Sequence, residues 1–227
     1  MSAEVDVLVA RLDLPAAELA ALLPLLDEGE RARAQRYGRE ILRSRFIAGR
    51  AFLRMALAVR LDTDPRRLRF TYGPRGKPAL DGPLRFNLSH TDDVALLALS
   101  ERGEIGADVE RVRPGMDHVA LAQRVFSARE TAWLVAHSEA ERPKAFFDCW
   151  TAKEAYVKAR GDGLAFPLQA FHALPGQFAV YDDRRESERW SVLPAPLAGD
   201  LSAAVAAEGD GWRPTLREWR WGEGEGP

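Results

Sequence analysis

Hydrophobic and polar positions follow two periods along this chain, and these periods predict both strands and helices. Val5, Val7 and Val9 alternate with other residues, which predicts a first strand. From 41 to 61 apolar residues recur at helical spacing, which predicts a long amphipathic helix. Further helices are predicted at 15–25, 118–125, 128–137 and 143–160. Further strands are predicted at 68–72, 84–88, 94–99, 105–110, 170–174, 177–181, 188–193, 201–207 and 214–221.

Capping residues support the boundaries of the helices in the second half of the chain. Ser127 and Glu130 have the spacing of a capping box at the start of the helix 128–137. Pro143 suits the first turn of the next helix, because a proline there removes no helical hydrogen bond. Gly161 and Gly163 flank Asp162 and predict the end of that helix, since glycine accepts a left-handed C-cap.

The order of predicted elements places the chain in the α+β fold class. The segment 111–115, which contains Pro114, is the best candidate for a boundary between two halves. We therefore expect an N-terminal subdomain over 1–111, a C-terminal subdomain over 112–221 and a disordered tail over 222–227. Each half contains helices and several strands, which suggests a duplicated unit, although no sequence repeat demonstrates it.

Composition indicates an ordinary globular protein and argues against several partners. Of the 227 residues 46% are hydrophobic and 29% are charged, with a net charge of −2, so no basic face for nucleic acid is expected. No apolar run reaches about 18 residues, and the acidic N-terminus does not resemble a secretory signal. Cys149 is the one cysteine, and it lies in an apolar helical run as a buried, inert thiol. We expect a cytoplasmic protein with no membrane partner.

Two acids on one predicted strand are candidate metal ligands. Asp108 and Glu110 lie at positions i and i+2, so their side chains share one face about 6.5–7 Å apart. Side chains at this spacing can converge on one cation, although two solvent-facing acids on an edge strand would give the same pattern. No histidine or cysteine cluster competes for a metal, so a hard cation with oxygen ligands is expected.

The helix 143–160 adds a third carboxylate and a lysine. Trp150, Glu154 and Lys158 are spaced i, i+4 and i+8 and share one stripe of the helix. Phe146 and Phe147 lie near the same stripe and must pack against something, which favours the wall of a cleft over an exposed Glu–Lys pair. The chain has 28 Arg but only four Lys, and two of those four lie in this helix, which suggests a need for a compact ammonium there.

Two upstream segments could contact phosphate. His90 ends the strand 84–88 between hydroxyl residues and could donate to a phosphate, although a lone histidine in such a place is more often structural. The segment 73–78 resembles a phosphate-binding loop, but its spacing is not that of a Walker motif and Pro78 lacks an N–H. Arg75 and Lys77 remain candidate phosphate contacts.

Together and in this order, these signals resemble the 4′-phosphopantetheinyl transferase superfamily. The motif GxDxE at 106–110 is followed about forty residues later by WxxKExxxKxxG at 150–161. The length, the GKP segment at 76–78 and the NLSH segment at 87–90 resemble the monomeric Sfp type. The resemblance covers most of residues 30–165, and beyond them the chain matches only in its β character. Ala107 departs from the family, where a bulkier aliphatic residue is usual.

The resemblance implies a fold and a set of site residues. Two similar α/β subdomains would pack side by side about a pseudo-twofold axis, with coenzyme A between them. Asp108, Glu110 and Glu154 would hold Mg²⁺ against the pyrophosphate of coenzyme A. Lys158 would bind that pyrophosphate and stabilise the leaving 3′,5′-ADP, and Lys153 would have a supporting or phosphate-screening role. His90 would meet the 3′-phosphate, with Lys77 and Arg45 as further phosphate contacts. Arg45 is assigned this role from the RFxxG pattern at 45–49.

The resemblance also implies a reaction and its partners. A serine of an apo acyl or peptidyl carrier protein would attack the β-phosphorus of coenzyme A, and Glu154 or a water on the metal would take its proton. The enzyme would act as a monomer, with Mg²⁺ as cofactor and coenzyme A as co-substrate. Two alternatives stay open at this point: a Mg²⁺-dependent hydrolase of pyrophosphates, and a noncatalytic module that binds coenzyme A or carrier protein. The transferase ranks first because the chain keeps all four of Asp108, Glu110, Glu154 and Lys158.

Overall fold

The computed structural model describes residues 3–161, 163, 166–174, 181–182, 190–209 and 211–222. Its α-helices are α1 (Ala16–Leu22), α2 (Glu28–Gln35), α3 (Glu40–Leu61), α4 (His118–Val125), α5 (Ala128–Val135) and α6 (Arg142–Arg160), with short 3₁₀ turns η1 (Leu23–Leu25), η2 (Pro65–Arg67) and η4 (Leu168–Ala170). Its strands are β1 (Ala3–Arg11), β2 (Thr71–Tyr72), β3 (Pro78–Ala79), β4 (Arg85–Thr91), β5 (Val94–Ser100), β6 (Ile105–Arg111), β7 (Phe171–His172), β8 (Tyr181–Asp182), β9 (Trp190–Pro194), β10 (Leu201–Glu208) and β11 (Trp212–Glu218).

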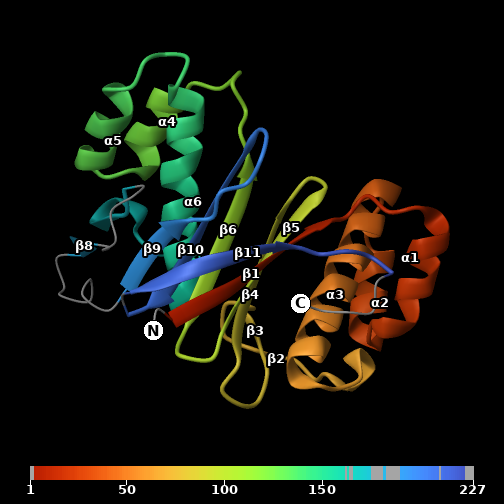
Figure 1. Ribbon diagram of the computed structural model, residues 1–227. Helices are drawn as coiled ribbons and strands as arrows, with labels where there is room; N and C mark the ends of the chain where they lie inside the picture. Colours follow the sequence, from red (N-terminus) through yellow and green to blue (C-terminus); the bar gives the residue numbers. More distant parts are fainter. Residues whose placement is uncertain are drawn as a thin grey trace.

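Two sheets lie at the centre of the molecule, and the helices cover their outer faces (Figure 1). One sheet has the order β11-β1-β5-β4 and the other has the order β6-β10-β9. Helices α1, α2 and α3 lie outside the first sheet, and α4, α5 and α6 lie outside the second. The arrangement is therefore four-layered, with the α+β character that the sequence predicts.

Alternation along the strands explains the layers. Val5 and Val7 of β1 point into the core between the two sheets, where they meet Ile105, Ala107 and Val109 of β6. The residues between them on the other face pack against helices, because successive strand side chains point to opposite faces. Thus Leu8 and Ala10 of β1 join the long helix α3, and Ala204 and Ala206 of β10 join α6. Both faces of each sheet are apolar because both are covered.

The order of the elements repeats within the described residues. In the first unit (residues 3–100), β1 is followed by α1–α3, the ribbon β2–β3 and the hairpin β4–β5. In the second unit (residues 105–208), β6 is followed by α4–α6, the ribbon β7–β8 and the hairpin β9–β10. The sheets repeat as well, since β1-β5-β4 and β6-β10-β9 have the same internal order. Two similar units packed side by side, as the resemblance implies, are therefore visible in the topology.

Strand pairing crosses the subdomain boundary that the sequence predicts at 111. Strand β6 precedes that position in the chain but pairs with β10. Strand β11 follows the second unit but returns to the first sheet, where it pairs in parallel with β1. Division into 1–111 and 112–221 stays a prediction about folding units, and the repeated element order would place the junction near 101–104 instead.

Several local predictions are confirmed and some are revised. The helices predicted at 41–61 and 143–160 correspond to α3 and α6, and the capping box of Ser127 and Glu130 is present. The sequence reading left the charged segment before α3 without structure, yet it contains α2. The strand predicted at 68–72 is limited to β2, whereas β4 extends three residues beyond its predicted end at 88.

Other predictions fall partly outside the described residues. These are the strand 177–181 before Tyr181, the beginning of the strand 188–193, Asp162 at the end of α6, and the tail beyond Gly222. The C-cap itself is described: Gly161 has a φ of 77°, which is the left-handed conformation predicted for it.

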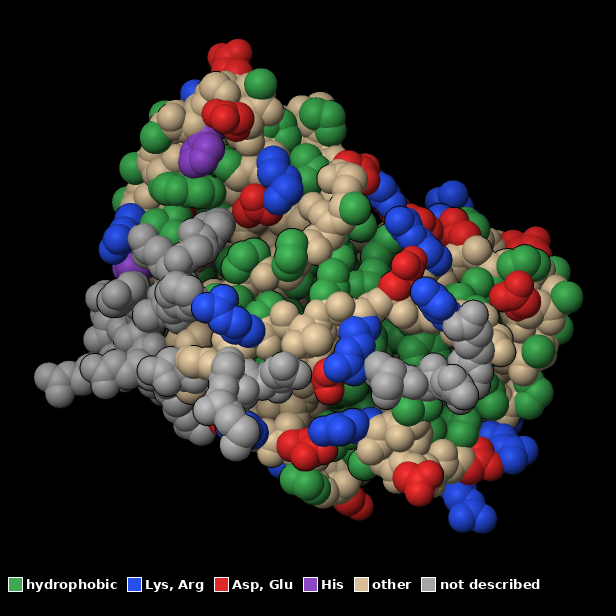
Figure 2. Space-filling model, viewed as in Figure 1, with side chains coloured by type: hydrophobic (Ala, Val, Ile, Leu, Met, Phe, Trp, Pro, Cys, Tyr) green, Lys and Arg blue, Asp and Glu red, His purple; other side chains and the backbone are tan. Residues whose placement is uncertain are grey.

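Surface charge is mixed rather than segregated on the face seen in Figure 2. Lys and Arg side chains lie beside Asp and Glu across the middle of this face. The intermixing agrees with the small net charge of the chain. In the part of the chain that the structure describes, no helix has the length and apolar character needed to cross a membrane.

Candidate active site

Strand β6 provides two acids on the face that the sequence predicts. Its odd-numbered residues Ile105, Ala107 and Val109 lie in the core between the sheets. Asp108 and Glu110 therefore point to the opposite face, toward α6, where Asp108 is buried and Glu110 is half-buried. The two candidate metal ligands are thus held by the backbone of one strand.

Helix α6 lies directly across β6 and brings Glu154 and Lys158 to the same place. The helix approaches so closely that a Cβ on Gly106 would lie 2.1 Å from the carbonyl oxygen of Ala155. Lys158 Nζ lies 2.5 Å from Asp108 Oδ1, and the Glu154 side chain is only 7% exposed. The acid of this stripe is buried, and the lysine is partly exposed, lines a hollow and contacts a buried carboxylate, as expected for the wall of a cleft.

A third element, β4, supports the carboxylates with hydroxyl groups. Ser89 Oγ donates to Asp108 Oδ1 at 2.8 Å and accepts from Lys158 Nζ at 3.0 Å. Thr91 Oγ1 donates to Glu110 Oε2 at 3.2 Å, and Asn87 Oδ1 accepts from the backbone N–H of Ala107 at 2.9 Å. Every second residue of β4 thus bonds to β6, although the two strands belong to different sheets.

The hydroxyl residues on either side of His90 bond to acids of β6, and this contact was not predicted from the sequence. The signal was present, because Asn87, Ser89 and Thr91 occupy alternate positions of a strand and are all buried. Buried polar side chains at a period of two require partners on one neighbouring element. The sequence could not show that this element is β6.

The three carboxylates repel one another within a buried space. Burial and the nearby charge of Asp108 raise the pKa of Glu154, and Glu110 adds to this effect. Burial and Asp108 likewise raise the pKa of Glu110, against the hydrogen bond from Thr91. Among the described residues, Asp108 Oδ2 and Glu154 Oε1 are buried without any hydrogen-bond partner. Buried carboxylate oxygens without a hydrogen-bond partner are compatible with a cation at this site, beside the one positive charge that Lys158 supplies.

The donor set suits a hard cation that takes only part of its ligands from the protein. In the residues that the structure describes, no three His, Cys, Asp or Glu side chains form a ready group of metal ligands. Mg²⁺ commonly binds through one or two carboxylates, with waters and substrate phosphates as its other ligands. Carboxylate oxygens such as Asp108 Oδ2 and Glu154 Oε1 therefore fit Mg²⁺, whereas a site for Zn²⁺ would need nitrogen or sulfur ligands.

Comparison with known proteins identifies the family. A family model described as the 4′-phosphopantetheinyl transferase superfamily matches residues 104–206. The 4′-phosphopantetheinyl transferase HetI of Nostoc sp. is 39% identical over 220 residues, which are 94% of this chain and 92% of the relative. The chain belongs to the 4′-phosphopantetheinyl transferase superfamily.

Other relatives carry the same description. The 4′-phosphopantetheinyl transferase AcpT of Salmonella typhimurium is 37% identical over 142 residues, or 62% of this chain and 70% of the relative. The 4′-phosphopantetheinyl transferase of Bacillus subtilis is 28% identical over 160 residues, or 70% of each chain. The resemblance inferred from the sequence motifs is confirmed. The chain is a transferase enzyme of this superfamily. The family model matches almost the same residues as the second structural unit, which supplies β6 and α6.

The residues predicted to contact phosphate lie at different distances from the carboxylates. His90 is exposed beside the site, where partial burial of its ring and the positive charges of Lys158 and Arg33 lower its pKa. Lys77 Nζ donates to Glu104 Oε2 at 2.9 Å and to the carbonyl oxygens of Ile105 and Ala159, both at 3.0 Å. In this structure Lys77 therefore fastens the end of α6 to the start of β6, and a phosphate contact would require it to exchange a partner.

Arg45 belongs to a network of ion pairs around the β4–β5 turn. Its guanidinium donates to both carboxylate oxygens of Asp13, at 2.6 and 2.8 Å, and lies 3.9 Å from Asp92. Asp92 in turn pairs with Arg111, which directly follows Glu110 in the chain. The structure connects Arg45 to the edge of the site through these charges, and its predicted phosphate contact stays a prediction.

A hollow of about 220 Å³ adjoins Lys158. Its lining includes Arg75 and Lys77, which the sequence predicted as phosphate contacts, and the two glycines that follow α6, Gly161 and Gly163. Gly163 has a φ of 66°, a left-handed conformation that favours glycine, and a Cβ there would only touch the Arg75 side chain at 3.4 Å. The hollow joins the basic loop at 75–77 to the lysine of the carboxylate site.

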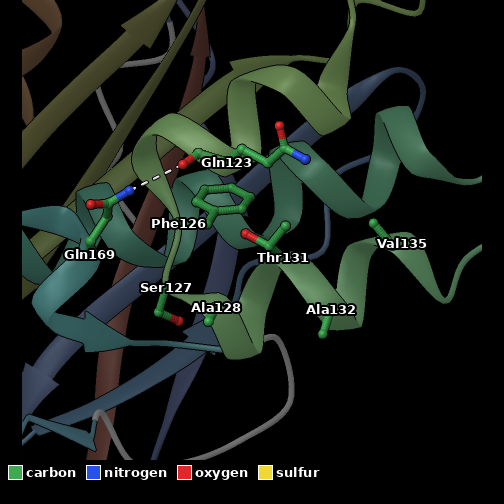
Figure 3. Close-up of a pocket in the computed structure, with 8 residues that line it drawn as sticks. All are labelled: Gln123, Phe126, Ser127, Ala128, Thr131, Ala132, Val135 and Gln169. Atoms are coloured by element: carbon green, nitrogen blue, oxygen red, sulfur yellow. Dashed lines mark hydrogen bonds between the residues drawn. The ribbon is translucent and has the colours of Figure 1, made fainter.

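A second hollow lies between α4 and α5 and contains none of the predicted site residues. Figure 3 shows its lining of mostly small and apolar side chains, with Phe126 at its back. Gln169 closes one end by donating to the backbone oxygen of Gln123 at 3.1 Å. No lysine, arginine or carboxylate lines this hollow, so it offers no group for phosphate or metal chemistry.

We expect Ser89→Ala to lower transferase activity about 10-fold while leaving the protein folded, because outer hydrogen bonds to a metal-binding carboxylate typically matter to this extent. The measurement is the initial rate of transfer as a function of Mg²⁺ concentration. Ser191→Ala is the matched control: Ser191 is a buried serine on β9 whose hydroxyl donates to the carbonyl oxygen of Gly209 at 2.6 Å. Equal rates for the two variants would contradict a role for Ser89 in the site.

Proposed function

We propose that this transferase moves the 4′-phosphopantetheine group from coenzyme A to a serine of an apo acyl or peptidyl carrier protein, with Mg²⁺ held by Asp108, Glu110 and Glu154. The observation that carries the proposal is the pair of buried carboxylate oxygens without a hydrogen-bond partner, Asp108 Oδ2 and Glu154 Oε1, close to the ammonium of Lys158. Such an arrangement suits a substrate whose reacting group is a pyrophosphate. The transfer class agrees with the family to which the chain belongs.

Mg²⁺ at these carboxylates would neutralise the charge of the pyrophosphate oxygens, which is the main electrostatic requirement of phosphoryl transfer. Asp108 is the central member of the ligand set, because it affects the pKa of both other acids. Ser89 and Thr91 orient Asp108 and Glu110 through their hydroxyl hydrogens.

Lys158 acts on the leaving group of the reaction, and Glu154 acts on the attacking serine. The serine oxygen forms a bond to the β-phosphorus, and the bond from that phosphorus to the bridging oxygen of 3′,5′-ADP breaks. Lys158 exchanges Asp108 for the pyrophosphate and stabilises the negative charge on the leaving 3′,5′-ADP. Glu154 is the carboxylate proposed to accept the serine proton.

The remaining basic residues would hold the phosphates of coenzyme A away from the reacting bond. His90 meets the 3′-phosphate, because it lies at the exposed edge of the site in a positively charged surrounding. Lys77 and Arg45 would add contacts by exchanging their present carboxylate partners for phosphate oxygens. These exchanges are plausible for exposed pairs, whose net stabilisation is about 0–1 kcal/mol.

The proposal includes a cellular setting. The enzyme acts as a cytoplasmic monomer on coenzyme A and a carrier protein, without nucleic-acid or membrane partners. The mixed surface charge and the net charge of −2 support the absence of a nucleic-acid partner. Size-exclusion chromatography with light scattering tests the monomer directly.

We expect intact-protein mass spectrometry to show the addition of one phosphopantetheine when an apo carrier protein is incubated with this enzyme, coenzyme A and Mg²⁺. EDTA should abolish the addition, and excess Mg²⁺ should restore it, because the carboxylates alone cannot neutralise the pyrophosphate. A carrier with its acceptor serine replaced by alanine is the matched control.

Two other outcomes would point to the alternative functions. Consumption of coenzyme A in the absence of any carrier would indicate a pyrophosphate hydrolase. Binding of coenzyme A with no modification of fatty-acid, polyketide or peptide carriers would indicate a noncatalytic binding module. Either result would overturn the proposed transfer reaction for this chain.

A further inference from the structure

Each structural unit contains one fully buried ion pair between its second and third helices. In the first unit the pair is Glu30 on α2 and Arg54 on α3, which we call the first clamp. Arg54 Nε donates to Glu30 Oε2 at 2.7 Å, and the Arg54 side chain is 0% exposed. Arg54 also donates to the carbonyl oxygen of Leu68, in the segment that follows its helix, at 3.2 Å.

In the second unit the corresponding pair is Glu130 on α5 and Lys153 on α6, which we call the second clamp. Lys153 Nζ donates to Glu130 Oε1 at 2.8 Å and to Glu130 Oε2 at 2.7 Å, and both side chains are 0% exposed. Lys153 also donates to the carbonyl oxygen of Phe171, in the segment that follows its helix, at 2.7 Å. Of the two roles expected for Lys153, supporting or phosphate-screening, its enclosure by protein favours the supporting one.

The two clamps occupy equivalent positions. Glu30 and Glu130 are each the third residue of a helix whose capping box they complete, with Asp27 and Ser127 as the capping residues. The partner cation follows 24 residues later in the first unit and 23 residues later in the second. A shared position in the repeat means that each clamp fixes the long helix of its unit against the short helix before it.

The first clamp has two further members, Arg50, which pairs with Glu30, and Asp27, which pairs with Arg54. The units also differ in the residues that follow the clamp cation. Lys153 is followed by Glu154 and, five residues on, by Lys158, both in the carboxylate site. At the corresponding places after Arg54 the chain has Met55 and Val59. Only the second clamp therefore lies next to residues of the carboxylate site. Consecutive helix positions are separated by about 100° around the axis, so fixing Lys153 on one face also fixes the direction of Glu154.

A buried ion pair is a costly way to stabilise a helix, since apolar side chains of similar size would often do as well. Its distinctive property is directional: the Lys153 ammonium has three donors, and all three bonds above end on Glu130 and Phe171. Glu130 is itself held by the N–H groups of Ser127 and Ala173, both at 2.8 Å. Rotation of α6 about its axis would break several of these bonds together.

We propose that Lys153 is a positioning residue: its clamp to Glu130 fixes the rotation of α6, so that Glu154 faces Asp108 and Glu110 in the geometry that binds the metal. The inference rests on the proposed function, because it assigns a purpose to the direction of Glu154. Lys153 itself does not contact substrate in this proposal. The first clamp secures the same joint in the other unit without a metal site beside it.

The test compares two neutralised clamps. Glu130→Gln with Lys153→Met removes the second clamp without leaving a lone buried charge. In the first unit Glu30 also pairs with Arg50, so the comparison variant is Glu30→Gln with Arg50→Met and Arg54→Met, which leaves only the partly exposed Asp27 without its arginine. The two readouts are Mg²⁺ binding to the free protein by isothermal titration calorimetry, and kcat and KM for coenzyme A with an apo carrier. Unfolding midpoints of both variants show how similar their structural cost is.

The expected result is a difference between the variants that stability does not explain. Loss of the second clamp should weaken Mg²⁺ binding by about 10-fold or more and lower kcat, with KM for coenzyme A changed far less. Loss of the first clamp should lower the unfolding midpoint but leave Mg²⁺ affinity within about threefold of wild type. The proposal would be overturned if the two variants bound Mg²⁺ with equal affinity, whether both kept the wild-type affinity or both lost it to the same extent. Failure of the wild-type enzyme to modify any carrier would instead count against the proposed function, since Mg²⁺ binding is measured without one.

Discussion

Replacement of Glu154 by glutamine should reduce transfer at least about 100-fold while leaving the enzyme folded, because the proposed site loses both a metal ligand and its base. Glutamine keeps the size and the hydrogen-bonding outline of the side chain, so packing around α6 is unchanged. The measurement is the single-turnover rate of carrier modification at saturating coenzyme A and Mg²⁺. Asp108→Ala should be equally inactive, since Asp108 is the carboxylate that influences both other acids.

Glu154→Gln should leave the metal-free protein as stable as the wild type or more stable. Folding raises the pKa of Glu154 above its ordinary value of 4.5, chiefly through burial and then through Asp108. The folded state therefore binds the proton more tightly, and Glu154 lowers stability progressively as pH rises from the ordinary pKa through the raised one. Glutamine removes this cost, so the gain in unfolding midpoint should be present at neutral pH and vanish under acid conditions.

The control for this pair of effects is Glu139→Gln, an exposed glutamate outside the site. Glu139→Gln should change neither the rate of carrier modification nor the pH dependence of the unfolding midpoint. Near-normal transfer by Glu154→Gln would remove Glu154 from the mechanism. A lower unfolding midpoint in metal-free Glu154→Gln protein would show that the side chain stabilises the fold, contrary to the strain of repulsion described above.

The sequence predicted the elements whose patterns are local and strong. The regular apolar spacing of 41–61 and 143–160 predicted α3 and α6, and strict alternation at 105–110 placed Asp108 and Glu110 on the face of β6 that they occupy. The stripe of Glu154 and Lys158 followed from helix geometry alone. These features needed no knowledge of which elements pair.

Helix α2 was missed because it has almost no apolar periodicity. Its sequence EGERARAQ is dominated by charged residues, and the residues it buries are Glu30 and Ala34. Its capping box, with Asp27 bonded to the N–H of Glu30 at 2.8 Å, was a signal of the same kind as the one recognised at Ser127. The buried charge of Glu30 could not be anticipated, since it depends on Arg54 from a helix 24 residues away.

Contacts between distant segments account for the other differences. Ser89 reaches Asp108 because β4 and β6, edge strands of different sheets, lie side by side. The return of β11 to β1 joins the last described strand to the first, and no local pattern specifies this pairing. Helix geometry showed that Lys153 and Glu154 face different ways, but only the packed structure shows that the Lys153 side faces inward.

Substitution of Gly106 by alanine should both destabilise the enzyme and inactivate it, because no side chain fits between β6 and α6. The added Cβ would lie 2.1 Å from the carbonyl oxygen of Ala155 and 2.3 Å from the backbone nitrogen of Ala159. Both are main-chain atoms of α6, so relief requires movement of the helix rather than of a flexible side chain. Overpacking of this kind typically costs about 1–3 kcal/mol, which for a chain of this length predicts a fall in unfolding midpoint of roughly 2–12 °C.

The loss of activity should exceed the loss of stability. Helix α6 carries Glu154 and Lys158, and a displacement of about 1 Å from β6 can reduce a reaction rate about 100-fold. We therefore expect Gly106→Ala to be inactive even at temperatures where circular dichroism shows it to be fully folded. Mg²⁺ binding should weaken with it, since Asp108 and Glu154 would no longer be held at their present separation.

A second glycine separates the effect of the close approach from that of the substitution itself. Gly49 lies buried in α3, and a Cβ there would meet no atom within 4 Å. Gly49→Ala should therefore stabilise the enzyme by about 0.5–1 kcal/mol through the higher helix propensity of alanine, with activity retained. Full activity in Gly106→Ala would contradict the packing seen here. Inactivity of a folded Gly106→Ala enzyme beside an active Gly49→Ala enzyme would show why glycine precedes the two acids of the motif: it sets the distance at which strand and helix share one cation.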